Sequence, residues 1–77
     1  MINIPDSEIF NAIMQVQRSG KIDMFNLELS IWYFRSVKEN KTADWIEANK
    51  SIYIQGLLAG FKNEVKEIKN ITNKFGI

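Results

Sequence analysis

Residues 18–26 read RSGKIDMFN, a glycine turn that carries two cations and leads into a Met-Phe pair. The apolar residues before this stretch have helical spacing, which predicts a first helix that begins near Asp6 and has one apolar side. That side consists of Ile9, Phe10, Ile13, Met14 and Val16. Gly20 can take the left-handed conformation that closes a helix, and Asn26 is a residue type that caps the next one. We therefore expect RSGKIDMFN to join two helices, with Met24 and Phe25 as an apolar plug against the core.

Further helices are expected after this joint. The second covers LELSIWYFRSVKEN, residues 27–40, and it is apolar on more than one face, so it is either central in the fold or in contact with a second molecule. Its inner stripe is expected to consist of Leu27, Ile31, Phe34 and Val37. Thr42 is the expected cap of a third helix and Ser51 that of a fourth. A strand over SIYIQ, residues 51–55, competes with the fourth helix.

The C-terminal part carries an apolar repeat with the 4-3 alternation of a coiled-coil seam. Its members are Ile54, Leu58, Phe61, Val65, Ile68, Thr72 and Phe75. The repeat predicts a longer amphipathic helix that associates with copies of itself through Leu58, Phe61, Val65, Ile68 and Phe75. A terminal helix packed on its own domain fits the same stripe. Another helix is expected to pack closely against Gly56, Ala59 and Gly60, with a bend in the helix as the alternative.

Length and composition limit the size of the domain and the ways in which it can be stabilised. Seventy-seven residues form one domain, and the sequence predicts an all-α bundle of three to four helices, with a core over residues 6–60 and a helical extension over 61–77. The chain has Cys 0 and His 0, so disulfides are excluded and self-association remains as the added source of stability. No signal peptide is recognisable, and the longest mostly apolar run, residues 52–61, is about half of a ~20-residue membrane span. We expect a cytoplasmic protein with no membrane partner.

The residue types that carry most enzyme chemistry are missing. General acid–base catalysis most often uses histidine, covalent catalysis often uses cysteine, and this chain has neither. Asp6 and Glu8, or Glu64 and Glu67, are close in sequence but lie on polar helix faces. No phosphate-binding loop, dinucleotide fingerprint or carboxylate-rich metal pattern is present. The sequence predicts a non-enzyme with no catalytic residue, no metal and no cofactor.

Two groups of residues are candidates for binding. Trp32, Tyr33 and Arg35 are of the types enriched at binding hot spots, although the aromatic pair could equally fill the core. Arg18 and Lys21 flank the glycine turn near the start of the second helix, which is a candidate anion site, although ordinary helix capping explains them as well. A DNA-reading helix-turn-helix is disfavoured because the turn is too long and the second helix is too apolar.

The run VQRSGKIDMFN, followed by a helix and then ADWIEANKSIYIQGLLAG, resembles a family of short domains of unassigned function in bacteriophages and prophages of Gram-positive bacteria. The resemblance covers roughly residues 9–60. The matching positions are Arg18, Ser19, Gly20, Met24, Phe25, Asn26, Trp45, Ile46, Glu47, Tyr53, Leu57, Leu58 and Gly60. It implies a phage origin, a small helical fold and a bacterial host cell, and it assigns no catalytic residue.

Three functions are open at this point. The first is a phage accessory protein that binds and modulates a host or defence protein through Trp32, Tyr33 and Arg35. The second is an oligomeric sponge that sequesters an anionic nucleotide signal, using Arg18, Lys21 and Arg35 with stacking on Trp32 or Tyr33. The third is a nucleic-acid-binding regulator, which the net charge of +1 disfavours.

Overall fold

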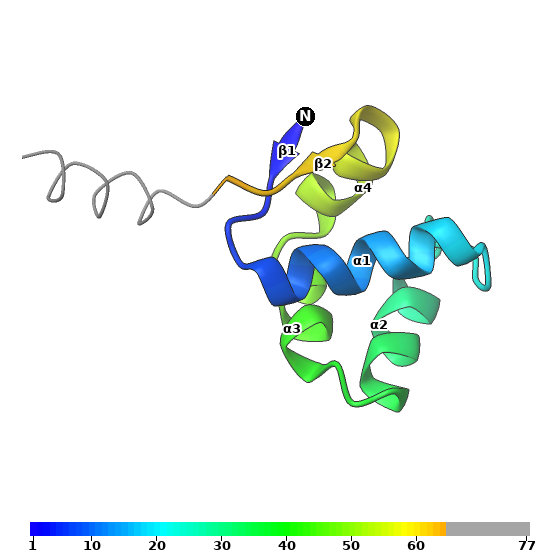
Figure 1. The fold of residues 1–77 in the computed structure, drawn as a ribbon. Helices are drawn as coiled ribbons and strands as arrows, with labels where there is room; N and C mark the ends of the chain where they lie inside the picture. The colour runs from blue at the N-terminus through cyan, green and yellow to red at the C-terminus, as the bar shows by residue number, and fades with distance from the viewer. Residues whose placement is uncertain (65–77) are drawn as a thin grey trace, which may run out of the picture.

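The computed structural model describes residues 1–64 and contains four helices and one small parallel sheet (Figure 1). The elements follow in the order β1 (Ile2–Asn3), α1 (Ser7–Ser19), α2 (Leu27–Ser36), α3 (Asn40–Ala48), α4 (Lys50–Ala59) and β2 (Phe61–Lys62). The predicted all-α class is confirmed, and the strand predicted as the alternative over residues 51–55 is wrong. The two-residue strands are an addition that the sequence did not indicate.

Local signals set both ends of α1. The Oδ1 atom of Asp6 accepts hydrogen bonds from the backbone N–H groups of Glu8 at 3.0 Å and Ile9 at 3.2 Å, which satisfies donors that have no partner within the helix. At the other end, Gly20 has φ 65° and its N–H donates to the Val16 carbonyl at 3.1 Å. The predicted start and end of the first helix are confirmed.

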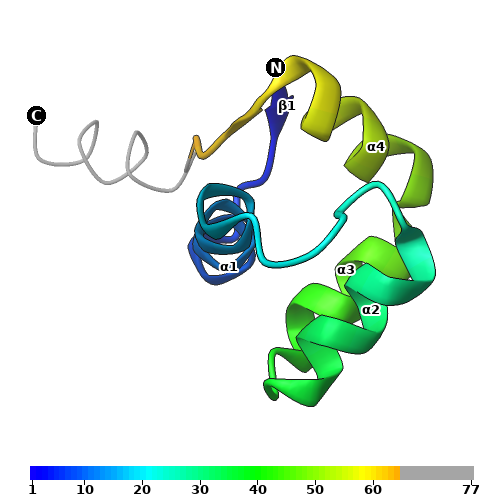
Figure 2. The ribbon, with the colours of Figure 1, turned by 90° about the vertical axis from the view of Figure 1, so that its right-hand side faces the viewer.

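The helices α2 and α3 form a hairpin in which the two lie side by side (Figure 2). Asn26 caps α2 as predicted, because its Oδ1 atom accepts the N–H of Leu29 at 3.1 Å. The helix ends at Ser36 rather than near residue 40, since Lys38 takes a left-handed φ of 64° and turns the chain back. Val37 is consequently exposed and does not belong to the inner stripe of α2.

The predicted caps of α3 and α4 are wrong. The early turn at Lys38 lets α3 begin at Asn40, so Thr42 lies inside its first turn and is fully buried. Asn49 ends α3 and directly precedes α4, so Ser51 likewise lies inside a helix. The buried Thr42 Oγ1 atom has no hydrogen-bond partner, which is uncommon for a polar atom in a protein interior.

The helix α4 does not continue into a long C-terminal helix. It ends at Gly60, which has φ 101°, and Phe61 then enters strand β2 and is buried. The Phe61 ring packs on Gly56, where a β-carbon would overlap it. Gly56 therefore admits an aromatic ring rather than a neighbouring helix, and the coiled-coil seam is interrupted at Phe61. The seam positions Val65, Ile68, Thr72 and Phe75 lie outside the described residues.

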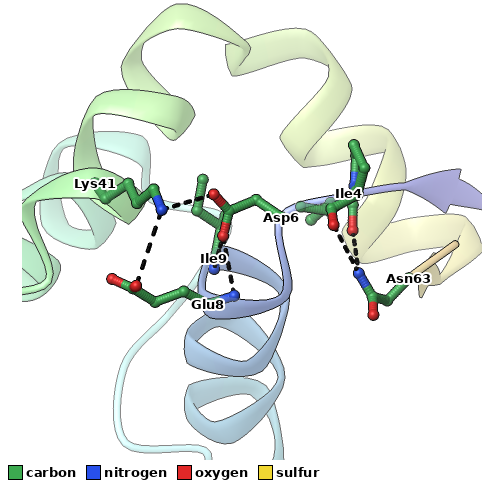
Figure 3. A network of polar contacts seen from close by, with 7 residues as sticks. Ile4, Asp6, Glu8, Ile9, Lys41 and Asn63 are labelled. Atoms are coloured by element: carbon green, nitrogen blue, oxygen red, sulfur yellow. Dashed lines mark hydrogen bonds and ion pairs between the residues drawn. The ribbon is translucent and has the colours of Figure 1, made fainter. Parts of the chain in front are cut away.

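The sheet joins the two ends of the described chain. Strands β1 and β2 are parallel, with Ile2 opposite Phe61 and Asn3 opposite Lys62. The side chain of Asn63 donates to the carbonyls of Ile4 at 2.8 Å and Pro5 at 3.2 Å (Figure 3). The start of α1 is therefore fixed to the segment that follows α4.

A buried hydrogen-bond chain connects three parts of the core. The Tyr53 hydroxyl of α4 donates to Ser30 Oγ of α2 at 3.1 Å, and Ser30 Oγ donates to the Met24 carbonyl at 3.0 Å. Tyr53, Ser30 and the neighbouring Phe34 are fully buried. Burial raises the pKa of the Tyr53 hydroxyl above its ordinary value, so this group stays protonated and available as a donor. These two hydrogen bonds hold the segment between α1 and α2 in one position.

Candidate partner-binding surface

Trp32 lies on the outer face of α2. Successive residues of an α-helix are about 100° apart, so Trp32 lies opposite Ser30 and Phe34, the two buried residues of this helix. Its side chain is 64% exposed. An aromatic residue of this size usually buries most of its surface, so an outward-facing tryptophan on a short, well-packed helix is the most distinctive apolar feature of this face.

Tyr33 does not share this face with Trp32. Its ring contacts the ring of Phe34 edge-to-face, with centroids 5.5 Å apart and an angle of 81° between the planes. It also lines a hollow of about 240 Å³, which we call the Lys21 hollow, together with Gln15, Val16, Ser19 and Lys21. The predicted aromatic pair is therefore split between the outer face of α2 and the side of α2 next to the end of α1.

Arg35 is held by two carboxylates of α3. Its Nη2 atom lies 2.8 Å from Asp44 Oδ1 and 3.5 Å from Glu47 Oε1. All three side chains remain partly exposed. Arg35 lies one turn after Trp32 and Glu28 lies one turn before it, so both are neighbours of Trp32 on α2, and Asp44 and Glu47 adjoin this group through their ion pairs with Arg35. We call Glu28, Trp32, Arg35, Asp44 and Glu47 the Trp32 surface.

The two residues of the candidate anion site are both exposed, but they are placed differently. Lys21 lines the Lys21 hollow beside Tyr33, whereas Arg18 lies in the last turn of α1. Arg35 does not join them, because it is bound to α3. Of the residues predicted for a nucleotide site, Lys21 and Tyr33 line the Lys21 hollow, whereas Trp32 and Arg35 belong to the Trp32 surface.

The prediction that Phe25 packs against the core together with Met24 is wrong. Met24 is buried as predicted, but Phe25 is 52% exposed and lines a second hollow of about 210 Å³ with Ile22 and Leu57. Its N–H donates to Asp23 Oδ1 at 3.1 Å, which fixes the backbone before α2. Two adjacent residues in extended or turn conformation generally point in different directions, so the Met-Phe pair could have been predicted to place one side chain outward.

A separate ion-pair cluster joins α1 to α3. Lys41 Nζ lies 2.8 Å from Asp6 Oδ2 and 3.9 Å from Glu8 Oε1 (Figure 3). The hydrogen bond from Lys41, with the N–H groups of the helix start, lowers the pKa of Asp6, and Asp6 in turn raises the pKa of Lys41. Asp6 is therefore both a cap and an anchor for α3, which explains it without a binding role.

Neither a metal site nor a membrane span is found in the part of the chain that the structure describes. Within residues 1–64, no three His, Cys, Asp or Glu side chains gather closely enough to hold a metal ion. None of the helices over these residues has the length and apolar character needed to cross a membrane. The chain matches no family model, no curated protein and no solved structure.

Proposed function

We propose that this protein is a non-enzymatic accessory protein of phage origin that binds and modulates a host or defence protein through the Trp32 surface. The observation that carries the proposal is the exposure of Trp32 on the side of α2 opposite its buried residues. Tryptophan and arginine dominate binding hot spots, because a large ring can bury much apolar area when a partner covers it. The phage origin rests on the motif around RSGKIDMFN.

The ion pairs of Arg35 support this role. Because Asp44 and Glu47 hold the guanidinium on α3, the polar rim beside Trp32 is already ordered before a partner arrives. Ordering long side chains on binding costs roughly 0.5–1.5 kcal/mol for each one, and a fixed rim avoids part of this cost. Tyr33 contributes indirectly, since it packs against the buried core and so helps to hold α2 in place.

The test is capture from a bacterial host lysate with the full chain as bait, quantified by mass spectrometry. Proteins captured through this surface should be depleted at least tenfold with Trp32→Ala, because hot-spot residues contribute about 2 kcal/mol or more. Ile52→Ala is the matched control, since Ile52 on α4 is 41% exposed and lies outside both the Trp32 surface and the predicted self-association seam. If both variants capture the same proteins as the parent chain, the proposed function is wrong.

A sponge for an anionic nucleotide is the second candidate, because Lys21 and Tyr33 line one hollow. A lysine can neutralise a phosphate while the tyrosine ring offers a stacking face. The test is a thermal-shift screen of the full chain against cyclic nucleotides, in which a ligand at 100 times its Kd adds about 2.7 kcal/mol to the free energy of unfolding. The absence of any shift, or a shift that Lys21→Ala leaves unchanged, would exclude this candidate.

Nucleic-acid binding is not favoured by the described residues. Residues 1–64 hold 7 Lys and Arg against 8 Asp and Glu, so this part of the chain has no excess of cations to neutralise phosphates. A nucleic-acid-binding regulator would retain DNA in a salt-dependent manner. We expect no retention at low salt.

A further inference from the structure

The Trp32 surface is acidic. Its carboxylates are Glu28, Asp44 and Glu47, and its single cation is Arg35. In the turn between α2 and α3, Lys38 and Glu39 contribute opposite charges and do not alter this balance. Lys41, the remaining cation of this helix pair, is bound to Asp6, the residue that caps α1. The exposed tryptophan is thus bordered by a net negative charge.

The carboxylates keep acceptor capacity for a partner. The Nη2 atom of Arg35 contacts one oxygen of Asp44 at 2.8 Å and one oxygen of Glu47 at 3.5 Å. Each carboxylate has two oxygens that can accept several hydrogen bonds, and both side chains are more than half exposed. One guanidinium shared between two carboxylates leaves the group with a net charge of −1.

From this geometry we infer that the Trp32 surface binds an arginine-bearing segment of its partner protein. A guanidinium stacks on the face of an exposed indole, and its N–H groups reach adjacent carboxylates in the same plane. The surface thereby selects a cationic partner rather than an acidic or purely apolar one. The inference rests on the proposed function, since it names the class of partner that the same surface takes.

The probe is a dye-labelled ten-residue peptide of alternating arginine and glycine, and its binding to the full chain is measured by fluorescence polarisation. The same peptide with glutamate in place of arginine is the control ligand. We expect saturable binding of the arginine peptide alone, weakening as salt rises because exposed charges are screened. Trp32→Ala and the pair Asp44→Asn with Glu47→Gln should each weaken binding about tenfold, whereas Glu8→Gln, which removes a negative charge from α1, should not.

The outcomes separate this inference from the proposed function. Equal binding of the two peptides, no saturable binding at low salt, or unchanged binding in the Asp44 and Glu47 variant would overturn the arginine-bearing partner. If capture from lysate still depends on Trp32 in that case, the proposed function stands with a partner of different chemistry. Circular dichroism of each variant confirms that the helices are retained, so a loss of binding is not a loss of folding.

Discussion

A β-carbon added at Gly56 would overlap the ring of Phe61, which packs on the backbone of α4. This contact explains why a glycine is kept inside a helix, where it costs roughly 1 kcal/mol relative to alanine. It also places Phe61 in the core beside Tyr53, with ring centroids 6.4 Å apart. The sequence shows that Gly56 lies within a helix. It does not show that Phe61 packs on it, because Phe61 lies after the end of that helix and helical spacing does not predict its position.

Gly56→Ala is expected to lower the free energy of unfolding by about 1–3 kcal/mol, because the added methyl group overpacks the site. Chemical denaturation with guanidinium provides the measurement. Combining Gly56→Ala with Phe61→Leu should give a smaller loss than the sum of the two single losses, since the smaller side chain leaves room for the methyl group. Strict additivity of the two changes would argue against this contact.

Thr42→Val is expected to raise the free energy of unfolding by about 1 kcal/mol. The change removes a buried hydroxyl without a hydrogen-bond partner and keeps a β-branched side chain of similar size and helix propensity. Thr42→Ser is the matched control, because it keeps the hydroxyl, loses the methyl group and should destabilise the fold. Urea denaturation compares the three chains. A loss of stability in Thr42→Val would mean that the hydroxyl has a partner after all.

At the scale of the elements, both ends of α1 and the start of α2 were predictable from the sequence, whereas the end of α2 and the starts of α3 and α4 were not. Asp6, Gly20 and Asn26 act through bonds to residues within four positions, so local sequence is sufficient to recognise them. The end of α2 depends on Lys38, a residue type that rarely takes positive φ, and no sequence signal marks it. Strand β2 pairs with residues some sixty positions away, and two-residue strands are too short to have a periodicity.

Asn63→Ala is expected to loosen the pairing of β1 with β2, because the carbonyls of Ile4 and Pro5 lose their donor. Leaving such acceptors unsatisfied costs about 1–3 kcal/mol where they are shielded from water. Amide hydrogen exchange should accelerate at Ile2 and Ile4, whose N–H groups donate to residues 60 and 62.

The matched control for this prediction is Ser7→Ala. It removes only an exposed hydrogen bond of 3.2 Å from Ser7 to the Asn63 side chain. Exchange at Ile2 and Ile4 should stay close to that of the parent chain. Equal acceleration in both variants would show that Asn63 has no special role in fastening the two strands.

At the scale of the whole molecule, the candidate surface was only partly predictable. Trp32 was expected either to fill the core or to cover a neighbour, and its exposure excludes the first alternative. The separation of Tyr33 from Trp32 follows from the burial of Phe34, which orients α2 so that Tyr33 lies next to the end of α1 and Trp32 faces outward. The partners of Arg35 lie 9 and 12 positions away and meet it only because α2 and α3 form a hairpin. Such contacts require the angle between helices, which a single sequence does not contain.

Stability is expected to fall at high pH because of Tyr53. Its pKa in the folded chain lies above the ordinary 10.0, so the unfolded chain releases this proton first as pH rises past about 10. The free energy of unfolding, measured with urea at a series of pH values, should therefore decrease from that pH upward. Tyr53→Phe should cost about 1 kcal/mol at neutral pH through the lost hydrogen bond to Ser30, yet flatten the alkaline decrease.

A smaller alkaline decrease should remain in Tyr53→Phe. Lys41 has a raised pKa because of Asp6, so the unfolded chain begins to lose this proton above the ordinary 10.5 while the folded chain still holds it. Parallel curves for the parent chain and Tyr53→Phe would contradict the assignment of the alkaline decrease to Tyr53.

The parallel pairing of β1 with β2 has a consequence for how the chain is made. Ribosomes synthesise proteins from the N-terminus, so β1 is made while its partners at Phe61 and Lys62 have not yet been added. The α2–α3 hairpin needs only contacts close in sequence and can form earlier. In the nascent chain, Ile2 and Ile4 therefore stay exposed until β2 emerges, and during that interval they are available to a chaperone.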